Sequence, residues 1–288
     1  MDAFFNILKA ILFGVIEGVT EWLPVSSTGH MILLEHFLPL TLGNEIFADA
    51  FYSMFEVVIQ LGAILAVILL FFRKLNPFAR SKTELEKRST WRLWLMVLIG
   101  ILPSGIIGVV LDNFLDAKLG NYVVVSLMLI VYGVAFILVE RRKNAVIRLD
   151  NVETISWRMA LAVGAFQVLS LIPGTSRSGA TILGAMLLGL SRGAASEFSF
   201  FMAIPTMAGA SMIRGLKFVK FALEYDGDAP WLLACAVLAV AFAVAFAVSL
   251  AAIRFLMDFV RRHTFTSFGI YRIALGAVVL GYFLIAGR

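Results

Sequence analysis

The hydrophobic positions of this chain form long uninterrupted runs rather than an alternating or helical pattern. A helix needs about 20 predominantly apolar residues to cross the hydrocarbon core of a bilayer. Runs of this kind, bounded by charged or turn-forming residues, occur at 51–72, 91–111, 121–139, 196–213, 231–253 and 268–286. We predict a transmembrane helix at each of them.

Two further hydrophobic regions, 1–40 and 156–190, are interrupted near the middle by a polar segment that contains proline and glycine. Neither half of either region is a comfortable membrane span. We therefore predict that each region forms two short helices joined by a turn, which enter the membrane and return to the side from which they came. The predicted fold is an all-α integral membrane protein with six transmembrane helices and two re-entrant segments.

The composition agrees with this class of protein. Of the 288 residues, 61% are hydrophobic and only 15% are charged, which excludes an ordinary soluble domain. The net charge is +5, but a basic excess in a membrane protein usually reports topology. We expect membrane lipids around the chain and no nucleic-acid partner. The single cysteine, Cys235, excludes an intrachain disulfide.

The basic residues are concentrated in three connecting segments. Loops 73–92, 140–158 and 254–267 carry them, whereas loops 112–120 and 214–230 carry no comparable excess. Because lysine and arginine are enriched in cytoplasmic loops, we place the three basic loops in the cytoplasm. The first re-entrant segment then enters from the outer side of the membrane and the second from the cytoplasmic side.

The two interrupted regions resemble each other. The sequence "IEGVTEWLPVSSTGHMIL" begins at Ile16, and "FQVLSLIPGTSRSGATIL" begins at Phe166. A shift of 150 positions aligns Glu17 with Gln167, Ser26 with Ser176, Thr28 with Ser178, and Gly29 with Gly179. The prolines, Pro24 and Pro173, then miss each other by one position, so the register stays open by one residue.

Each interrupted region is followed by three predicted spans, which favours a duplication. We predict one membrane domain, 1–288, made of a first repeat, 1–145, and a second repeat, 146–288. Because three crossings is an odd number, the second repeat should be inverted, as in many transporters. The polar turns would then meet near the middle of the bilayer. Their backbone N–H groups, with the helix starts near Gly29 and Ser178, favour binding of an anion.

An acidic pair precedes the first turn. Glu17 and Glu21 are four positions apart on a predicted helix and therefore lie on one face. Two bare carboxylates repel each other, so a proton, a cation or an arginine is needed nearby. A charge at this depth costs about 2.5–3.5 kcal/mol on insertion scales, which favours a functional role. The alternative is that both glutamates snorkel to the outer surface. They are candidate bases and candidate metal ligands.

The second turn holds one cation, Arg177, in "PGTSRSG". An arginine in this setting predicts a bidentate clamp for phosphate or carboxylate. The alternative is a structural cap that binds the carbonyls of its own loop. Around it, Thr175, Ser176, Ser178 and Gly179 offer hydroxyl and backbone donors to phosphate oxygens.

The first turn contains a cluster of hydroxyl groups. Ser26, Ser27 and Thr28 are candidate nucleophiles, and His30 is a candidate general acid. The backbone of Gly29 adds a donor. A lone histidine in an apolar helix is more often a core residue, but His30 directly follows the hydroxyl cluster.

Three further polar residues are predicted to support the site from behind: Glu56, Gln60 and Gln167. Glu56 is a candidate partner for Arg177, although a hydrogen bond between helices explains it nearly as well. Arg272, four residues into the last span, is predicted to snorkel to the cytoplasmic surface.

Taken together, "EGVTEWLPVSSTGH" at 17–30 and "PGTSRSG" at 173–179 resemble the motifs of the undecaprenyl-pyrophosphate phosphatase family, the bacitracin-resistance proteins of bacterial inner membranes. The resemblance covers the full chain. It implies that the family's acidic pair, serine, histidine and arginine are Glu17 and Glu21, Ser27, His30, and Arg177. It also implies hydrolysis of a C55 prenyl pyrophosphate lipid to its monophosphate, which recycles the carrier for peptidoglycan synthesis, and dependence on a divalent cation, Mg²⁺ or Ca²⁺.

From the residues and the resemblance together we expect a phosphoryl-transfer mechanism. Ser27 attacks the terminal phosphorus, and Glu21 or His30 accepts its proton. Arg177 and a cation held by Glu17 and Glu21 stabilise the charge.

The sequence leaves open whether Ser26 or Ser27 attacks, and it does not fix the oligomeric state, for which a homodimer is the candidate. We expect the site to open toward the periplasmic side of the inner membrane. The competing hypothesis is a transporter or flippase of an anionic lipid, because inverted repeats with facing turns are typical of transporters. Replacing Ser27 by alanine discriminates the two, since a binding site tolerates the loss of one hydroxyl and a nucleophile does not.

Overall fold

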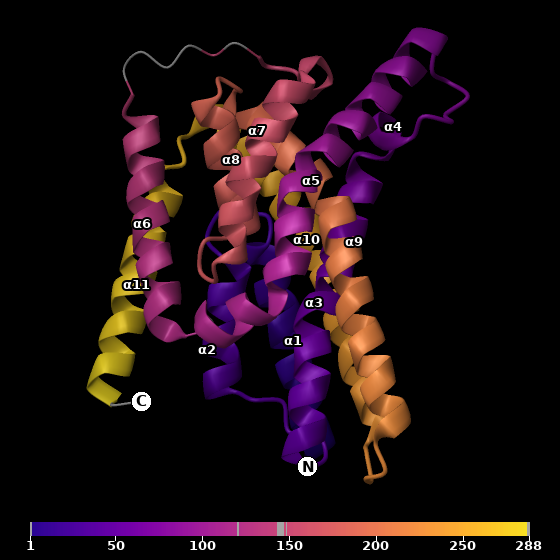
Figure 1. Ribbon diagram of the computed structural model, residues 1–288, viewed down its shortest axis with the longest axis vertical. Coiled ribbons are helices and arrows are strands. Elements are labelled where there is room, and N and C mark those ends of the chain that lie inside the picture. Colours follow the sequence, from indigo (N-terminus) through magenta and orange to yellow (C-terminus); the bar gives the residue numbers. More distant parts are fainter. Residues whose placement is uncertain (1, 120, 143–146, 148, 287–288) are drawn as a thin grey trace.

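The computed structural model describes residues 2–119, 121–142, 147 and 149–286, and the regular structure of these residues is helical (Figure 1). The α-helices are α1 (Asp2–Thr20), α2 (Ser27–Phe37), α3 (Glu45–Leu70), α4 (Phe72–Leu75), α5 (Glu84–Leu119), α6 (Tyr122–Glu140), α7 (Trp157–Val168), α8 (Arg177–Leu187), α9 (Arg192–Glu224), α10 (Trp231–Arg262) and α11 (Thr266–Ala286). Two short 3₁₀ turns are η1 (Val152–Thr154) and η2 (Leu169–Leu171). The boundary that we predict between residues 145 and 146 lies outside the described residues.

Six of the described helices are long and apolar enough to cross a membrane: α1, α3, α5, α6, α10 and α11. Five of them coincide with predicted spans over most of their length. The sixth is α1, which has 19 residues and meets the criterion of length and composition although it lies in a region predicted to be re-entrant. The predicted span at 196–213 is not among these six. That stretch is helical within α9, but Ser196, Ser199 and Pro205 make it less apolar than the other spans.

Several helices extend beyond the apolar runs that predicted them. Helix α5 has 36 residues and continues through Pro103 to Leu119, so most of the predicted loop at 112–120 is helical. Helix α9 has 33 residues and extends past its apolar run to Glu224. Run length therefore identified the apolar part of each helix but not its ends, because polar residues outside the membrane continue the helical hydrogen bonding.

The connections are sorted between the two ends of the molecule. Those that follow α3 and α10, and the described residues of the connection after α6, lie toward the upper end in Figure 1, and they belong to the three basic segments. The N-terminus and the connection between α9 and α10 lie at the lower end (Figure 1). The charge asymmetry of the sequence thus corresponds to the two ends of the helical bundle.

Both interrupted regions form two helices joined by a turn. Residues 21–26 join α1 to α2, and residues 172–176 follow η2 and lead into α8. Helix α1 begins at the lower end of the molecule and α7 begins at the upper end, and the two turns meet near mid-height (Figure 1). Side chains of one turn contact the other directly, as described below.

Glycines allow the first helix of each region to pack closely on a neighbour. Helix α1 packs along α10, and α7 packs along α5. A Cβ atom at Gly14 would lie 2.5 Å from the carbonyl oxygen of Ala241, and one at Gly164 would overlap the carbonyl of Gly100. Only glycine permits such an approach between two helices. Gly14 and Gly164 are separated by the same 150 positions as the aligned motifs.

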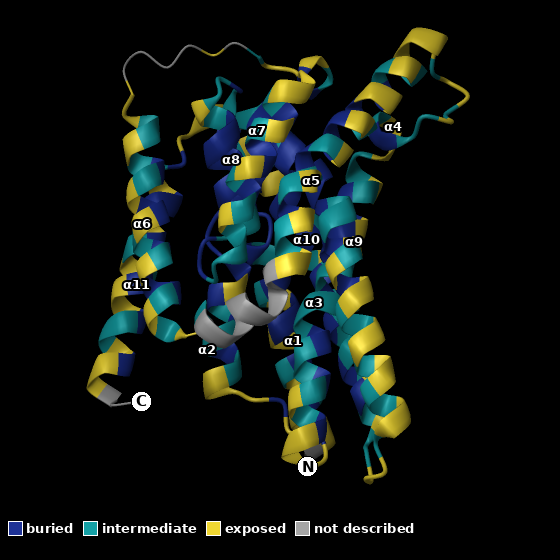
Figure 2. Cartoon of the chain, in the orientation of Figure 1, coloured by how far each residue is buried: buried dark blue, intermediate teal, exposed yellow. Residues whose placement is uncertain are grey.

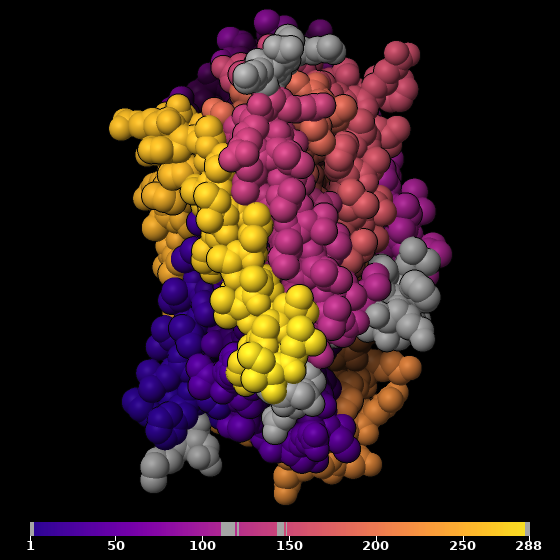
Figure 3. All heavy atoms as spheres, turned by 90° about the vertical axis from the view of Figure 1, so that its left-hand side faces the viewer, coloured from indigo at the N-terminus to yellow at the C-terminus, as the bar shows by residue number. Residues whose placement is uncertain are grey.

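Helices α6 and α11 form a second close pair, which lies along one face of the molecule (Figure 3). A Cβ at Gly133 would lie 2.6 Å from the carbonyl oxygen of Gly269, and a Cβ at Gly269 would lie 2.7 Å from that of Gly133. This pair contacts the turns through residues of both helices.

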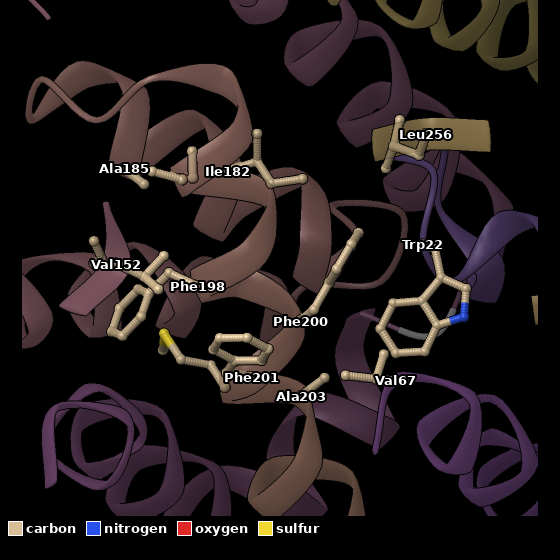
Figure 4. Packing of buried hydrophobic residues seen from close by; sticks show 14 of the residues in the cluster. Trp22, Val67, Val152, Ile182, Ala185, Phe198, Phe200, Phe201, Ala203 and Leu256 are labelled. Atoms are coloured by element: carbon tan, nitrogen blue, oxygen red, sulfur yellow. The ribbon is translucent and has the colours of Figure 1, made fainter. Parts of the chain in front are cut away.

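The protein core surrounds the turns. Trp22, in the first turn, is fully buried and packs edge-on against Phe200 of α9, with ring centroids 5.0 Å apart (Figure 4). Buried residues face inward in the helices, and exposed ones cover the outside (Figure 2). Many exposed side chains are large and apolar, such as Leu232 and Val278. A surface of this composition is suited to contact with lipid tails.

Candidate active site

The two turns share an uncommon backbone geometry. Ser26 and Ser176 have φ angles of 75° and 73°, and they are the non-glycine residues with positive φ in the described chain. Each caps the helix that follows, because its Oγ accepts a hydrogen bond from the N–H of Gly29 (3.3 Å) or Gly179 (3.1 Å). This correspondence favours the alignment of the two motifs with a shift of 150 positions. In that alignment Ser27 and Arg177 are equivalent residues.

Glu21 joins the two turns through its carboxylate. The Ser27 hydroxyl donates to Oε2 at 2.6 Å, and Nη2 of Arg177 donates to Oε1 at 3.0 Å. The side chains of Arg177 and Glu21 are 9% and 5% exposed, so this ion pair is shielded from solvent. The structure therefore brings together three side chains that the sequence predicts on two separate segments: the candidate nucleophile Ser27, the candidate base Glu21 and the cation Arg177.

Arg177 does not cap its own loop. Its Nη1 donates to the carbonyl oxygen of Ser199 on α9 at 2.7 Å, and its Nε has no hydrogen-bond partner among the described residues. The guanidinium is thus anchored on one side and keeps a donor for another acceptor. An arginine donor without a partner can bind an oxygen of a phosphate or carboxylate group.

Among the described residues, Glu17 is a fully buried acid whose carboxylate accepts no hydrogen bond. It lies one helical turn before Glu21. Its charged neighbours are Glu21, Glu56 and Arg177. An uncompensated buried carboxylate is costly, and hard divalent cations prefer such oxygen ligands. The donor set fits a divalent cation on this basis.

No group of three or more metal-binding side chains is assembled within the described residues. Magnesium usually takes one or two carboxylates from the protein and completes its shell with water and phosphate oxygens. Glu17 and Glu21 match that pattern.

His30 is held by both ring nitrogens. Nδ1 lies 2.7 Å from the carbonyl oxygen of Ser26, and Nε2 lies 2.7 Å from the hydroxyl of Tyr271 on α11. Because a carbonyl only accepts, Nδ1 carries the proton, and Nε2 of a neutral ring accepts from Tyr271. The ring also stacks on Tyr271 in parallel. In this arrangement neither nitrogen is directed to Ser27, which binds Glu21 instead.

The other residues predicted for the two turns differ in whether their side chains form hydrogen bonds within the described part of the chain. Ser178 donates to the backbone carbonyl of Glu21 at 3.0 Å, and its hydroxyl lies 3.1 Å from that of Ser176. Thr175 is fully buried, and its hydroxyl has no partner among the described residues. Thr28 is exposed.

The three residues predicted to support the site from behind, Gln167, Glu56 and Gln60, have different surroundings. Gln167 donates to Ser104 of α5 at 2.6 Å and to Thr206 of α9 at 3.3 Å, so it joins three helices. Glu56 is one of the charges near Glu17. Gln60 is half-buried in α3.

Arg272 is a residue of the site whose role the sequence analysis missed, and the prediction that it snorkels to the surface is wrong. It is fully buried in α11 and donates to the carbonyl oxygens of Pro24, Gly174 and Thr175 at 3.1, 2.8 and 2.8 Å. The only hint in the sequence is an arginine within an apolar run, and this pattern does not distinguish a residue that faces the interior of a bundle from one that snorkels.

A cavity of about 1270 Å³ lies elsewhere, between α6, α8, α9 and α10. Two ion pairs border it, Lys74 with Glu197 at 2.8 Å and Arg192 with Glu140 at 2.6 Å. Arg192 donates hydrogen bonds to the carboxylate of Glu140, and this contact raises the pKa of Arg192 above its usual value. The described residues that line this cavity include none of those predicted for the site.

The fold and the two turns define a multi-pass membrane protein with an enclosed polar centre, in which a serine, an acidic pair and an arginine converge from two helical regions. The family model of the bacitracin resistance protein BacA matches residues 10–278, and the chain belongs to this family.

Relatives of known name are similar over nearly their whole length. The undecaprenyl-diphosphatase of Enterococcus faecalis is 50% identical over 282 residues, covering 98% of this chain and 99% of the relative. That of Streptococcus mutans is 52% identical over 280 residues, covering 97% and 96%. That of Limosilactobacillus fermentum is 50% identical over 279 residues, covering 96% and 98%.

Proposed function

We propose that this protein hydrolyses undecaprenyl pyrophosphate to undecaprenyl phosphate and inorganic phosphate within the membrane. Membership of the BacA family and full-length similarity to proteins named undecaprenyl-diphosphatase support the reaction. The observation that carries the proposal is the Glu21 carboxylate, which binds the Ser27 hydroxyl and the Arg177 guanidinium at the same time.

Ser27 is the nucleophile in this proposal, and Glu21 is its base. The hydroxyl already donates to Glu21 at 2.6 Å, so the proton passes to Oε2 as Oγ forms a bond to the terminal phosphorus. The bond from that phosphorus to the bridging oxygen breaks, and the prenyl monophosphate leaves with the electron pair. Water then attacks the seryl phosphate, which releases inorganic phosphate and restores the hydroxyl. Ser26 is the helix cap and is not placed for this role.

Arg177 binds the phosphate oxygens in this proposal. Its unpartnered Nε is available without breaking a contact, and Nη2 becomes available when Glu21 takes the proton. The backbone N–H groups at the starts of α2 and α8 add positive potential. Positioned positive charge is the main source of rate enhancement in phosphoryl transfer.

Glu17 and Glu21 would hold the divalent cation, Mg²⁺ or Ca²⁺. When bound, the cation supplies charge neutralisation for the pyrophosphate oxygens. The structure supports a division of labour between the two acids: Glu17 has two unpartnered oxygens, whereas both oxygens of Glu21 are engaged by Ser27 and Arg177. We therefore assign metal binding mainly to Glu17 and proton transfer to Glu21.

His30 serves the first turn by holding the carbonyl of Ser26. A role as general acid requires Nε2 to exchange its contact with Tyr271 for one with the substrate. His30 therefore remains a site residue in this proposal, and it acts as a general acid only if Nε2 leaves Tyr271 for the substrate.

We further propose that both helical regions are re-entrant and form an inverted repeat. The matching caps at Ser26 and Ser176, the matching close contacts at Gly14 and Gly164, and the opposite directions of α1 and α7 support this interpretation (Figure 1). With the basic connections in the cytoplasm, the first turn enters from the outer face of the bacterial cytoplasmic membrane, and the site opens to that side. A homodimer is the oligomeric state to be tested.

The alternative of a lipid transporter or flippase without hydrolysis is not favoured. A binding site has no need of a serine hydroxyl paired with a carboxylate base, and the named relatives are diphosphatases. Catalysis and binding nevertheless use the same turns, so the experiment must measure both.

The experiment is phosphate release from undecaprenyl pyrophosphate by the purified protein in detergent, with Mg²⁺, with Ca²⁺ and with EDTA. Wild-type protein should release phosphate only with the cation, and Ser27→Ala and Arg177→Ala should not. Ser53→Ala, a change of the same size on α3 outside the turns, is the matched control and should retain activity. Binding of the lipid by wild-type protein without release of phosphate would contradict the proposal and favour the transporter.

A further inference from the structure

Arg272 is a buried arginine that has no role in the proposed reaction. It connects the two turns to the pair of helices α6 and α11. We propose that Arg272 is a positioning residue, which fastens the two turns to each other and thereby holds Ser27 and Arg177 on Glu21. It touches neither the nucleophile nor the base, and its effect is exerted through the backbone of both turns.

The contacts of Arg272 reach both turns at once. Nη1 donates to the carbonyl oxygen of Pro24 in the first turn, and Nη2 donates to those of Gly174 and Thr175 in the second. The carbonyl of Leu129 on α6 lies at 3.5 Å from Nε. Pro24 lies three positions before Ser27, and Gly174 and Thr175 lie three and two positions before Arg177, so fixing these three carbonyls also restrains the backbone from which both side chains project.

The charge of Arg272 is balanced by these carbonyls rather than by an acid. No carboxylate within the described residues forms an ion pair with it, and the ring of Tyr132 lies 5.5 Å from its Cζ. Burying a guanidinium without a counter-ion is costly. Turn carbonyls at this depth, however, have no water to accept from, and an arginine with five donors satisfies several of them together.

Two glycines, Gly179 and Gly174, allow close packing beside the Arg272 guanidinium and beneath the second turn. A Cβ at Gly179 would lie 3.0 Å from Nη1 of Arg272, so a larger residue at the start of α8 would press on it. Gly174 has a φ of 89°, and a Cβ there would lie 2.5 Å from the carbonyl oxygen of Val125 on α6. The second turn is thus seated directly on α6 while Arg272 holds it from α11.

The test compares Arg272→Met and Arg272→Lys with Arg254→Met, a matched control in which an exposed arginine of α10 is changed. Hydrogen–deuterium exchange of the turn amides is the first measurement, and it needs no substrate. Arg272→Met should accelerate exchange in residues 21–26 and 172–176 and leave the long helices unchanged. Acceleration throughout the protein, or no change in the turns, would overturn the proposal.

The second measurement is kinetic and rests on the proposed function. Misplacing reacting groups by about 1 Å costs on the order of 100-fold in rate, so kcat should fall by about that factor. KM should stay within about threefold, because the turns bind pyrophosphate by several donors and the prenyl tail lies outside them. Arg272→Lys should restore part of kcat, since one ammonium group can hold one turn but not both. An unchanged kcat in Arg272→Met would contradict the proposal.

Failure of the two proposals can be told apart. If wild-type protein releases no phosphate, the proposed function fails, and the exchange measurement still decides whether Arg272 joins the turns. If Arg272→Met does not fold, Arg272→Lys takes its place in both measurements. If neither variant folds while Arg254→Met does, Arg272 serves folding as a whole, and the positioning role is refuted.

Discussion

The Ser27 hydroxyl and the Arg177 guanidinium bind the two oxygens of one carboxylate, that of Glu21, at 2.6 and 3.0 Å. Ser27 and Arg177 occupy equivalent positions after the caps Ser26 and Ser176, although one can act as a nucleophile and the other as a cation. The two turns thus have similar backbones but carry different side chains at the position after the cap. Glu21 connects them, because it belongs to the first region and reaches across to the second.

Ser27 and Ser26 should respond differently to substitution. Ser27→Ala should lower kcat by about 10³-fold or more, since loss of a nucleophile removes the reaction path. Ser26→Gly should retain most activity, because glycine tolerates the positive φ and replaces a cap at a cost of only a few tenths of a kcal/mol. Phosphate release by the two purified variants checks both expectations. Equal loss in both would remove the distinction between nucleophile and cap.

Variants of Glu17 and Glu21 should differ in how their activity depends on the cation concentration. Glu17→Gln should raise the Mg²⁺ concentration needed for half-maximal activity by at least about tenfold, with activity partly recovered at high Mg²⁺. Glu21→Gln should keep a low kcat at every Mg²⁺ concentration, because it loses the proton acceptor of Ser27.

Titration of activity with Mg²⁺ for both variants is the measurement. The reverse pattern, with Glu21→Gln rescued by metal and Glu17→Gln not, would exchange the roles that we assign.

Packing of α1 on α10 should depend on Gly14. Gly14→Ala places a Cβ 2.5 Å from the Ala241 carbonyl oxygen and should destabilise the protein by about 1–3 kcal/mol. The matched control is Gly209→Ala in α9, where a Cβ meets nothing within 4 Å, and alanine there should stabilise by about 0.5–1 kcal/mol. Thermal unfolding in detergent compares the two. An unfolding midpoint for Gly14→Ala at or above that of Gly209→Ala would show that the helices do not pack as closely as described.

Much of the fold could be predicted from run length, because a helix that crosses lipid must be apolar over a fixed distance. This reasoning located α3, α5, α6, α10 and α11. Run length left two features unpredicted: α1 is by itself long and apolar enough to cross a membrane, and the stretch 196–213 within α9, which contains Ser196, Ser199 and Pro205, is not among the described helices that are. Helix ends outside the membrane were not predictable in this way, since hydropathy does not report them.

The site was predictable only as far as the motifs extend. The polar turns and their similarity indicated that Ser27, Glu21 and Arg177 belong together, although Glu21 and Arg177 are 156 positions apart. The contacts of Arg272 with three carbonyls and of Tyr271 with His30 were not predictable, because neither leaves a local pattern. A single arginine near the end of an apolar run looks the same whether it turns outward to the lipid headgroups or inward to the bundle.

The central claim is that Ser27 forms a covalent intermediate, and trapping that intermediate is the most direct measurement. Prenyl pyrophosphate labelled in its terminal phosphate is mixed with a molar excess of wild-type protein and Mg²⁺, and the reaction is quenched with acid within one turnover. The account predicts labelled phosphoserine at Ser27, found by mass spectrometry of the peptide, and none in Ser27→Ala. Formation of labelled inorganic phosphate by Ser27→Ala at the wild-type rate, with no label on either protein, would contradict it.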